Sequence, residues 1–381
     1  MEKIRAGIIG TGFMGYAHLE ALRRLPEVEV IAVAASRPEK AEEFARTHQV
    51  PRAHADALAL IADPDVDVVH DCAPNHLHFA FNQAALAAGK HLLSEKPLAM
   101  NSAETGALAE LAERSGRVAA VNHCYRYYPL VQQARQMVQR GGLGRLLLVH
   151  GAYLQDWLLY PSDYNWRVDA ERGGPLRALG DIGSHWCDLA QHVTGRRITH
   201  VCADRATIHA TRLRPASAAG TFQSTDSRES VETAVTTEDY AAILLRFDDG
   251  THGFFAVSQV SAGHKNELTV ELDCAEGALR WNQEDPNILW IGRRDRPNEL
   301  VAKDPRLQDA PAATYAHYPG GHPEGYPDTF KNLFQNVYRH VADPSAPAEF
   351  PTFREAHEIT RVLEAIDTSC REGRWVEVKT D

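Results

Sequence analysis

Near the N-terminus the chain reads IRAGIIGTGFMG (residues 4–15), an apolar run followed by three glycines in the spacing Gly-x-Gly-x-x-Gly. A helical pattern over residues 13–25 begins inside this motif, which predicts a strand, a tight turn and a helix. Gly10 permits the turn, Gly12 lets the backbone approach a pyrophosphate, and Gly15 lets the helix pack closely on the strand. The N–H groups and the dipole at the start of the helix would face that anion. The motif therefore predicts dinucleotide binding, with a purely structural glycine turn as the alternative.

The first third of the chain alternates short apolar runs with helical patterns. The expected strands cover residues 4–9, 28–35, 66–72, 91–94 and 118–121, and the expected helices cover residues 13–25, 38–47, 79–88 and 102–115. Such alternation is typical of βαβ units, whose parallel strands are covered by helices on both faces. We therefore expect an α/β fold that begins with a Rossmann domain, a doubly wound parallel sheet, over residues 1–123.

The pattern changes after about Asn122. A helix over residues 130–140 is followed by strand-like runs with few helices between them, and the chain ends in a helix; these elements cover residues 146–153, 199–208, 240–247, 253–259, 268–273, 288–291 and 353–372. Residues 155–178 and 292–325 are expected to be long loops, and residues 211–237 an exposed, mobile segment. We expect a second, α+β domain over residues 124–381, with a large, mainly antiparallel open sheet that serves substrate binding and oligomerisation.

Composition and charge narrow the classes of function. The chain has 381 residues, a formal net charge of −11 and six scattered cysteines without a CxxC pair. An acidic surface disfavours nucleic-acid binding, and the cysteine pattern disfavours a disulfide framework or a structural zinc site. No secretory leader or membrane-spanning run is visible, so we expect a cytoplasmic protein without a membrane partner. The pairs His76/His78 and His185/His192 lack a nearby third ligand, so no metal site is expected.

The end of the second expected strand bears on the choice between NAD and NADP. An NAD-binding domain usually places an acidic residue there to bind the ribose hydroxyl groups. This sequence has Ser36 and Arg37 at that point. A neutral serine does not repel a 2′-phosphate, and Arg37 could pair with one, which slightly favours NADP. The alternative is that Arg37 stacks on the adenine of either cofactor.

Three further motifs, PNHLH (residues 74–78), EKP (residues 95–97) and GDIGSH (residues 180–185), follow expected strands or loops. Together with the glycine motif they make the chain resemble the Gfo/Idh/MocA family, the glucose–fructose oxidoreductase and inositol dehydrogenase family, over essentially its whole length. The segments QDWLL (residues 155–159), YNWR (residues 164–167) and GGHPEGYPDTF (residues 320–330) are similar to the branch of this family that contains levoglucosan dehydrogenase.

The resemblance implies that Lys96, Asp181 and His185 are catalytic. An ammonium group can donate to a developing alkoxide or carbonyl oxygen, and an imidazole can accept a hydroxyl proton at neutral pH. If Asp181 opens a helix, its side chain and that of His185 fall on one face. The structural alternatives are a surface lysine, a helix N-cap for Asp181 and a packed histidine for His185.

The resemblance also implies the cofactor and substrate contacts. The cofactor, NAD or NADP, would be bound by Gly10, Thr11, Gly12, Phe13, Met14, Gly15, Ser36, Arg37, Ala73, Pro74, Asn75, His78, Glu95, Lys96, Asn122, Trp166 and Arg167. The substrate would be bound by Lys96, Tyr153, Asp181, His185 and His322. For His322 the alternative is a loop that only shapes a turn before the next helix.

These residues lead us to expect hydride transfer between a nicotinamide and a hydroxyl carbon of a neutral sugar, anhydrosugar or inositol. Polar loops that carry aromatic residues suit such ligands, because each hydroxyl needs a hydrogen-bond partner and sugar faces pack on aromatic rings. Two alternatives stay open: a glycoside hydrolase that oxidises its sugar transiently, and a sensor that binds the cofactor without catalysis. The open sheet and the resemblance imply a homodimer or homotetramer.

Overall fold

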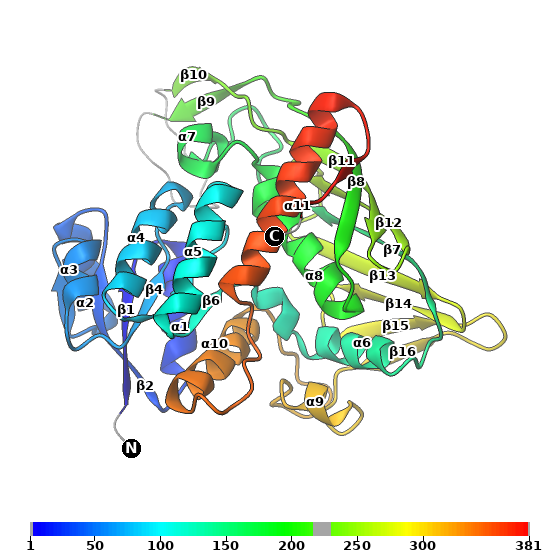
Figure 1. Ribbon diagram of the computed structural model, residues 1–381, viewed down its shortest axis with the longest axis horizontal. Helices are drawn as coiled ribbons and strands as arrows, with labels where there is room; N and C mark the ends of the chain where they lie inside the picture. Colours follow the sequence, from blue (N-terminus) through cyan, green and yellow to red (C-terminus); the bar gives the residue numbers. More distant parts are fainter. Residues whose placement is uncertain (1–2, 216–229, 380–381) are drawn as a thin grey trace. The chain divides into compact units, whose positions relative to one another are not determined.

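The computed structural model describes residues 3–215 and 230–379 and divides the chain into two compact units (Figure 1). The first unit contains residues 1–124 and 327–360, and the second contains residues 125–326 and 361–381. The domain boundary expected after residue 123 thus lies one residue before Cys124, the last residue of the N-terminal segment of the first unit. Residues 327–360, which the sequence placed in the second domain, group with the first unit.

The described part of the first unit contains a six-stranded parallel sheet in the order β3-β2-β1-β4-β5-β6. Its strand order reverses at β1 and β4, which is the arrangement predicted for a doubly wound sheet. The strands are β1 (Ile4–Ile9), β2 (Val28–Ala34), β3 (Arg52–His54), β4 (Val68–Asp71), β5 (His91–Ser94) and β6 (Ala119–Val121). The helices between them are α1 (Phe13–Arg23), α2 (Pro38–His48), α3 (Ala57–Ala62), α4 (Asn75–Ala87) and α5 (Ser102–Ser115). The pair β3 and α3 was not expected from the sequence.

The C-terminal part of the chain completes the core of the first unit. Helix α10 (Tyr326–Ala342) brings Phe334 against His18 of α1 and His70 of β4, with ring centroids 4.8 and 5.0 Å apart. The start of α11 (Phe353–Glu372) adds Phe353 to the main apolar cluster of the sheet. Helix α10 buries an apolar stripe, but its sequence does not indicate which sheet that stripe covers.

The second unit is built on a nine-stranded sheet in the order β16-β15-β14-β13-β7-β12-β11-β8-β17. Neighbouring strands in this sheet are antiparallel, except that β7 and β12 are parallel. This confirms the prediction of a mainly antiparallel sheet. The strands are β7 (Leu146–Leu154), β8 (Ile198–Ala206), β11 (Tyr240–Phe247), β12 (His252–Ser258), β13 (Glu267–Cys274), β14 (Gly277–Asn282), β15 (Ile288–Gly292), β16 (Glu299–Ala302) and β17 (Val376–Glu377).

One face of this sheet carries helices α6 (Pro129–Gln139) and α8 (Ser184–Thr194) (Figure 1). Trp186 of α8 stacks on Phe255 of β12 at 4.2 Å, and both side chains are buried. The close packing requires Gly151 on β7, because a Cβ there would lie 2.0 Å from the Thr269 carbonyl oxygen and 2.8 Å from the indole nitrogen of Trp186. This packing fixes α8, the helix that carries His185, against the sheet.

The expected loops contain short elements. Residues 155–178 include a 3-10 turn (Trp166–Val168) and α7 (Ala170–Gly173), and residues 292–325 include β16 and α9 (Ala310–Ala313). In the segment 211–237, which was expected to be exposed, β9 (Thr211–Pro215) pairs with β10 (Ser230–Ala234), and most residues of the two strands are exposed as expected. Arg212 is 1% exposed because its charge is neutralised by Asp239 inside the protein. Residues 216–229 lie outside the described residues.

No helix within residues 3–215 and 230–379 has both the length and the apolar character that crossing a membrane requires. All six cysteines are free.

Candidate functional site

The glycine turn has the geometry that a dinucleotide pyrophosphate requires. Gly10 has φ 102°, and a Cβ on Gly15 would lie 2.0 Å from the Gly10 carbonyl oxygen. A Cβ on Gly12 would meet nothing within 4 Å, so this position is open toward the outside of the turn. Helix α1 starts at Phe13 without a side-chain cap on Gly12. The turn and the positive end of α1 therefore fit a bound pyrophosphate, as the sequence predicts.

Ser36 and Arg37 lie directly after β2, and both are exposed. The Gly10 N–H donates to the carbonyl of Ala34 at 2.8 Å, which holds the end of β2 next to the glycine turn. The adjoining surface thus has a hydroxyl and a guanidinium where an acidic residue would select NAD.

The loops after β4 and β5 are tied together by His78. Its Nδ1 lies 2.7 Å from the Pro97 carbonyl oxygen and its Nε2 lies 2.7 Å from that of Ala73. These contacts place Ala73, Pro74 and the start of α4 beside the EKP segment, which joins Lys96 and Pro97 through a cis peptide bond. The cofactor contact expected of His78 stays a prediction, since the ring is buried between the two loops.

Glu95 and Asn122 lie after β5 and β6 and are turned into the first unit, where they are 5% and 2% exposed. The Asn122 amide donates to Glu95 Oε1, and the Lys96 N–H donates to Glu95 Oε2 at 3.2 Å. Burial raises the pKa of Glu95, but hydrogen bonds from His18 and Asn122 outweigh it, so this pKa lies below its usual value. The side chain of Lys96 itself is half-buried. Direct cofactor contacts of Glu95 and Asn122 stay predictions.

The helix that carries Asp181 and His185 begins earlier than the sequence indicated. A π-helical turn over Leu179–Gly183 runs directly into α8, so Asp181 lies inside the helix and neither opens nor caps it. The N-terminus is capped from elsewhere: the Leu179 N–H donates to Glu238 Oε1 at 2.8 Å. Burial raises the pKa of Glu238. Because that partner is distant in sequence, no local pattern could reveal the true start of the helix. Single π turns occur frequently at functional sites.

The Asp181 carboxylate is held at both oxygens. Gln259 Nε2 donates to Oδ2 at 3.0 Å, and Arg167 Nε lies 3.4 Å from Oδ1. The Arg167 guanidinium also lies over the Trp166 ring, 4.5 Å from its centroid. Trp166 and Arg167 were expected to contact the cofactor. In the structure Arg167 contacts the Asp181 carboxylate, and the Trp166 ring packs under the Arg167 guanidinium. Gln259 was missed, although it ends an expected strand and strand ends often carry functional side chains.

His185 is 6% exposed and packs against a network of hydroxyl and amide groups. Its ring centroid lies 4.5 Å from that of Tyr125, whose hydroxyl is 2.8 Å from that of Tyr153. Tyr153 donates to Asn266 Oδ1 at 2.6 Å, and Asn266 Nδ2 donates back to Tyr125 at 3.0 Å. Burial raises the pKa of Tyr153 well above its usual value, so it stays neutral. The substrate contact expected of Tyr153 stays a prediction, because its hydroxyl is already bonded.

His322 lies on an exposed loop before α10, with its Nδ1 3.4 Å from the Gly320 carbonyl oxygen. The neighbouring Glu324 anchors this loop: it accepts from Lys303 Nζ at 2.7 Å and from the His317 N–H at 2.9 Å, and Lys303 and Glu324 are both buried. The loop position is therefore fixed, while a substrate contact through His322 stays a prediction.

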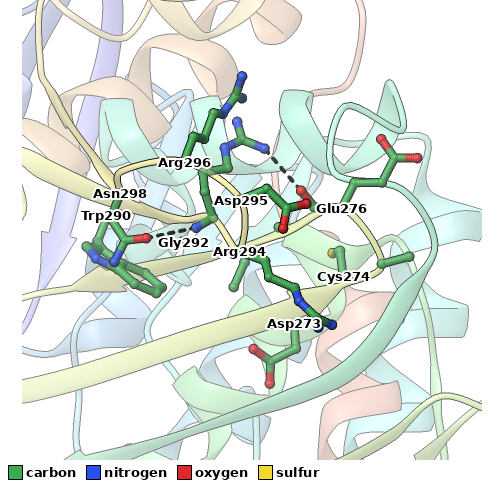
Figure 2. Close-up of a pocket in the computed structure, with 13 residues that line it drawn as sticks. Asp273, Cys274, Glu276, Trp290, Gly292, Arg294, Asp295, Arg296 and Asn298 are labelled. Atoms are coloured by element: carbon green, nitrogen blue, oxygen red, sulfur yellow. Dashed lines mark hydrogen bonds between the residues drawn. The ribbon is translucent and has the colours of Figure 1, made fainter.

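A cavity of about 670 Å³ lies in another part of the second unit, between the end of β13 and the turn that joins β15 and β16 (Figure 2). Trp290, Arg294 and Asp273 line it, and none of the candidate residues does. Asp273 also belongs to a group with His150 and Glu271, whose ligand atoms lie within 4.8 Å of one another on β7 and β13. The histidine pairs considered from the sequence are not in this group.

Family models match both units. Residues 4–123 match a model described as an oxidoreductase family with an NAD-binding Rossmann fold, and residues 131–280 match a GFO/IDH/MocA C-terminal domain. The levoglucosan dehydrogenase of Pseudarthrobacter phenanthrenivorans is 32% identical, over 76% of this chain and 76% of that protein.

Solved structures agree over nearly the full length. A levoglucosan dehydrogenase in complex with NADH and L-sorbose is 28% identical with a TM-score of 0.89, covering 100% of both chains. An inositol dehydrogenase homologue from Azotobacter vinelandii in complex with NAD+ is 27% identical with a TM-score of 0.85, covering 99% of this chain and 97% of that one.

Proposed function

The chain belongs to the Gfo/Idh/MocA family of NAD-binding oxidoreductases, and on this premise we propose that it is a dehydrogenase of a neutral sugar, anhydrosugar or inositol. The observation that carries the proposal is the Asp181 carboxylate, held at both oxygens one helical turn from His185. A structural aspartate on a helix needs no such double support. The substrate class is supported by the relatives described as levoglucosan dehydrogenase and as an inositol dehydrogenase homologue.

The proposed chemistry divides among three side chains. His185 accepts the proton of the substrate hydroxyl, and its packing against Tyr125 fixes the plane of the ring. Lys96 holds the oxygen, with its ammonium stabilising the negative charge that develops on it, and the Asp181 carboxylate accepts from a substrate hydroxyl or from the imidazole and orients it. A bound nicotinamide supplies the acceptor or donor of the hydride. The reverse reduction uses the same groups in the opposite direction.

The proposal is tested by screening the purified protein with NAD+ and NADP+ against neutral sugars, anhydrosugars and inositols, following the near-ultraviolet absorbance of the reduced nicotinamide. We expect stoichiometric release of reduced cofactor with at least one compound. Release of an aglycone without net cofactor reduction would identify the transient-oxidation glycoside hydrolase instead. Tight cofactor binding with no turnover of any compound would identify the sensor.

We also propose that the protein slightly prefers NADP over NAD. Ser36→Asp should shift the ratio of kcat/KM values toward NAD+ by about tenfold or more, because a carboxylate repels the 2′-phosphate and accepts from the ribose hydroxyl. Ser102→Asp, at the start of α5, controls for the added charge. An unchanged cofactor ratio in the Ser36 variant would show that this position does not read the 2′ group.

The homo-oligomer expected from the sequence is supported by apolar side chains on the outer face of the second sheet. Leu244 and Phe254 are cross-strand partners on β11 and β12, and they are 51% and 43% exposed. We expect Phe254→Glu to lower the mass measured by light scattering to that of a smaller species, because a charge cannot be buried unpaired in an apolar interface. Leu307→Glu, at another exposed apolar position, should leave the mass unchanged. The cytoplasmic location stays a prediction.

A further inference from the structure

Four polar side chains form a continuous buried line in the first unit. Glu95 Oε1 lies 2.9 Å from His18 Nε2, His18 Nδ1 lies 2.9 Å from His70 Nδ1, and His70 Nε2 lies 2.9 Å from the Tyr338 hydroxyl. His18, His70 and Tyr338 are 0% exposed. They come from α1, β4 and α10, and the line ends at the residue before Lys96.

Hydrogen-bond chemistry constrains the contacts of this line. An ionised Glu95 can only accept, so His18 Nε2 donates to it. Burial and the nearby His18 lower the pKa of His70 well below its usual value, and burial raises that of Tyr338. A neutral His70 has one ring nitrogen that donates and one that accepts, so it can join His18 to the Tyr338 hydroxyl. Every contact then holds one hydrogen.

The carboxylate at the end of the line connects to the proposed site. Glu95 Oε1 also accepts from Asn122, and Oε2 accepts from the backbone N–H of Lys96. The orientation of the carboxylate therefore affects the position of the Lys96 backbone, and with it the position of the Lys96 side chain.

Packing alone does not account for these residues. Phe330 and Phe334 surround the His18 ring at 5.9 and 4.8 Å, an environment in which leucine would bury more apolar surface without a hydrogen-bonding requirement. Burying two imidazoles and a carboxylate is costly unless every polar atom is paired. A network of this kind is favourable where it fixes one geometry.

We propose that His18, His70 and Tyr338 are positioning residues that orient Glu95 and, through it, Lys96 for hydride transfer. The proposal rests on the proposed role of Lys96. None of the three touches the reacting atoms; each fixes the next one in the line. Loss of any member leaves the fold available but allows Lys96 to leave its productive orientation.

The decisive comparison is between two buried histidines of the first unit. His18 belongs to the line, whereas His357 bonds Thr105 of α5 at 2.8 Å. We expect His18→Leu to lower kcat about 10- to 100-fold while the dissociation constant of reduced cofactor stays within about twofold. His357→Leu should keep the wild-type kcat. His18→Gln, which can still donate and accept, should recover most of the loss.

Equal kcat values in the His18→Leu and His357→Leu variants would overturn the proposal, and so would a His18→Leu variant that loses cofactor binding instead of kcat. Should His18→Leu fail to fold, Tyr338→Phe removes only the hydroxyl at the far end of the line. We expect it to lower kcat about two- to fivefold without changing cofactor binding. An unchanged kcat would contradict the proposal.

A second measurement does not depend on turnover. Nitrogen-15 spectra of the full chain labelled at histidine, assigned with the His18 and His70 variants, should show His18 protonated at Nε2 and His70 neutral in a single tautomer. Tyr338→Phe should release His70 from this tautomer. If His70 exchanges between its two tautomers in the wild type, the line does not fix one geometry and the proposal fails. These spectra keep their meaning even if the wild-type protein oxidises no compound in the screen, which would refute only the proposed function.

Discussion

Hydride transfer should fall about a thousandfold or more when Lys96 is replaced by alanine, while reduced cofactor still binds. The ammonium is the one positive group that the proposed chemistry places on the substrate oxygen, and the removal of such a donor costs two to three orders of magnitude or more. The glycine turn and the start of α1 do not depend on this side chain. The measurement pairs kcat at saturating substrate with a fluorescence titration of reduced cofactor.

Lys90→Ala provides the matched control. Lys90 precedes the same strand, β5, and its Nζ donates to the carbonyl oxygens of Asp63 and Val66 at 2.7 Å. Its loss should cost stability and leave turnover near the wild-type value. Activity that survives in the Lys96→Ala variant would remove this lysine from the mechanism.

The second large effect concerns stability. Asp239→Ala should lower the free energy of unfolding of the second unit by about 3 to 5 kcal/mol, because it leaves two guanidinium groups buried without a counter-ion. Arg177 and Arg212 both donate to Asp239 Oδ1, and all three side chains are 0% exposed. The backbone N–H of His209 donates to Oδ2 at 3.0 Å. Urea unfolding followed by circular dichroism measures the loss.

Asp249→Ala is the comparison, since Asp249 pairs with Arg196 at 2.6 Å on the surface. Exposed pairs contribute about 0 to 1 kcal/mol. Similar losses in the two variants would contradict the account of the buried pair.

The same cluster carries a pH dependence of known sign. Burial raises the pKa of Asp239, but the charge of Arg177 and the hydrogen bonds from Arg177, His209 and Arg212 outweigh it, so its pKa in the folded protein lies below the usual value. A depressed folded-state pKa stabilises above the unfolded pKa, and this contribution is lost as the pH falls through the acidic range. The stability difference between wild type and Asp239→Ala should therefore shrink in acid.

Loss of Asp239 should also loosen a segment next to the candidate site. Arg212 donates to the backbone carbonyls of Leu158, Tyr160 and Asp163 at 2.9 to 3.0 Å, so it holds the segment that leads to Trp166 and Arg167. These two residues support Asp181.

The sequence predicted those helices, strands and turns whose conformation depends on residues close together in the chain. The glycine motif fixed the first strand, turn and helix because each glycine has a steric task that the sequence makes visible. The strands that alternate with helices led to the parallel sheet for the same reason. The motif residues then located Lys96, Asp181 and His185 at a strand end and on a helix.

Features that depend on distant partners could not be predicted. His18 lies within an expected helix, but its role appears only when β4, β5 and α10 surround it. Arg212 belongs to a polar segment that looks exposed until Asp239 is placed beside it. Glu238 caps a helix that starts 59 residues earlier in the chain. In each case groups far apart in sequence form a hydrogen bond or an ion pair, and the sequence around either residue alone does not indicate the other.

The central proposal is that Lys96 and His185 act on the same substrate oxygen. A double-mutant cycle followed by single-turnover hydride transfer tests it most directly. Groups that act as a unit give strongly non-additive losses. We predict that Lys96→Ala with His185→Ala is no more than about threefold slower than the slower single variant. Losses that multiply, as for two independent residues, would contradict the account.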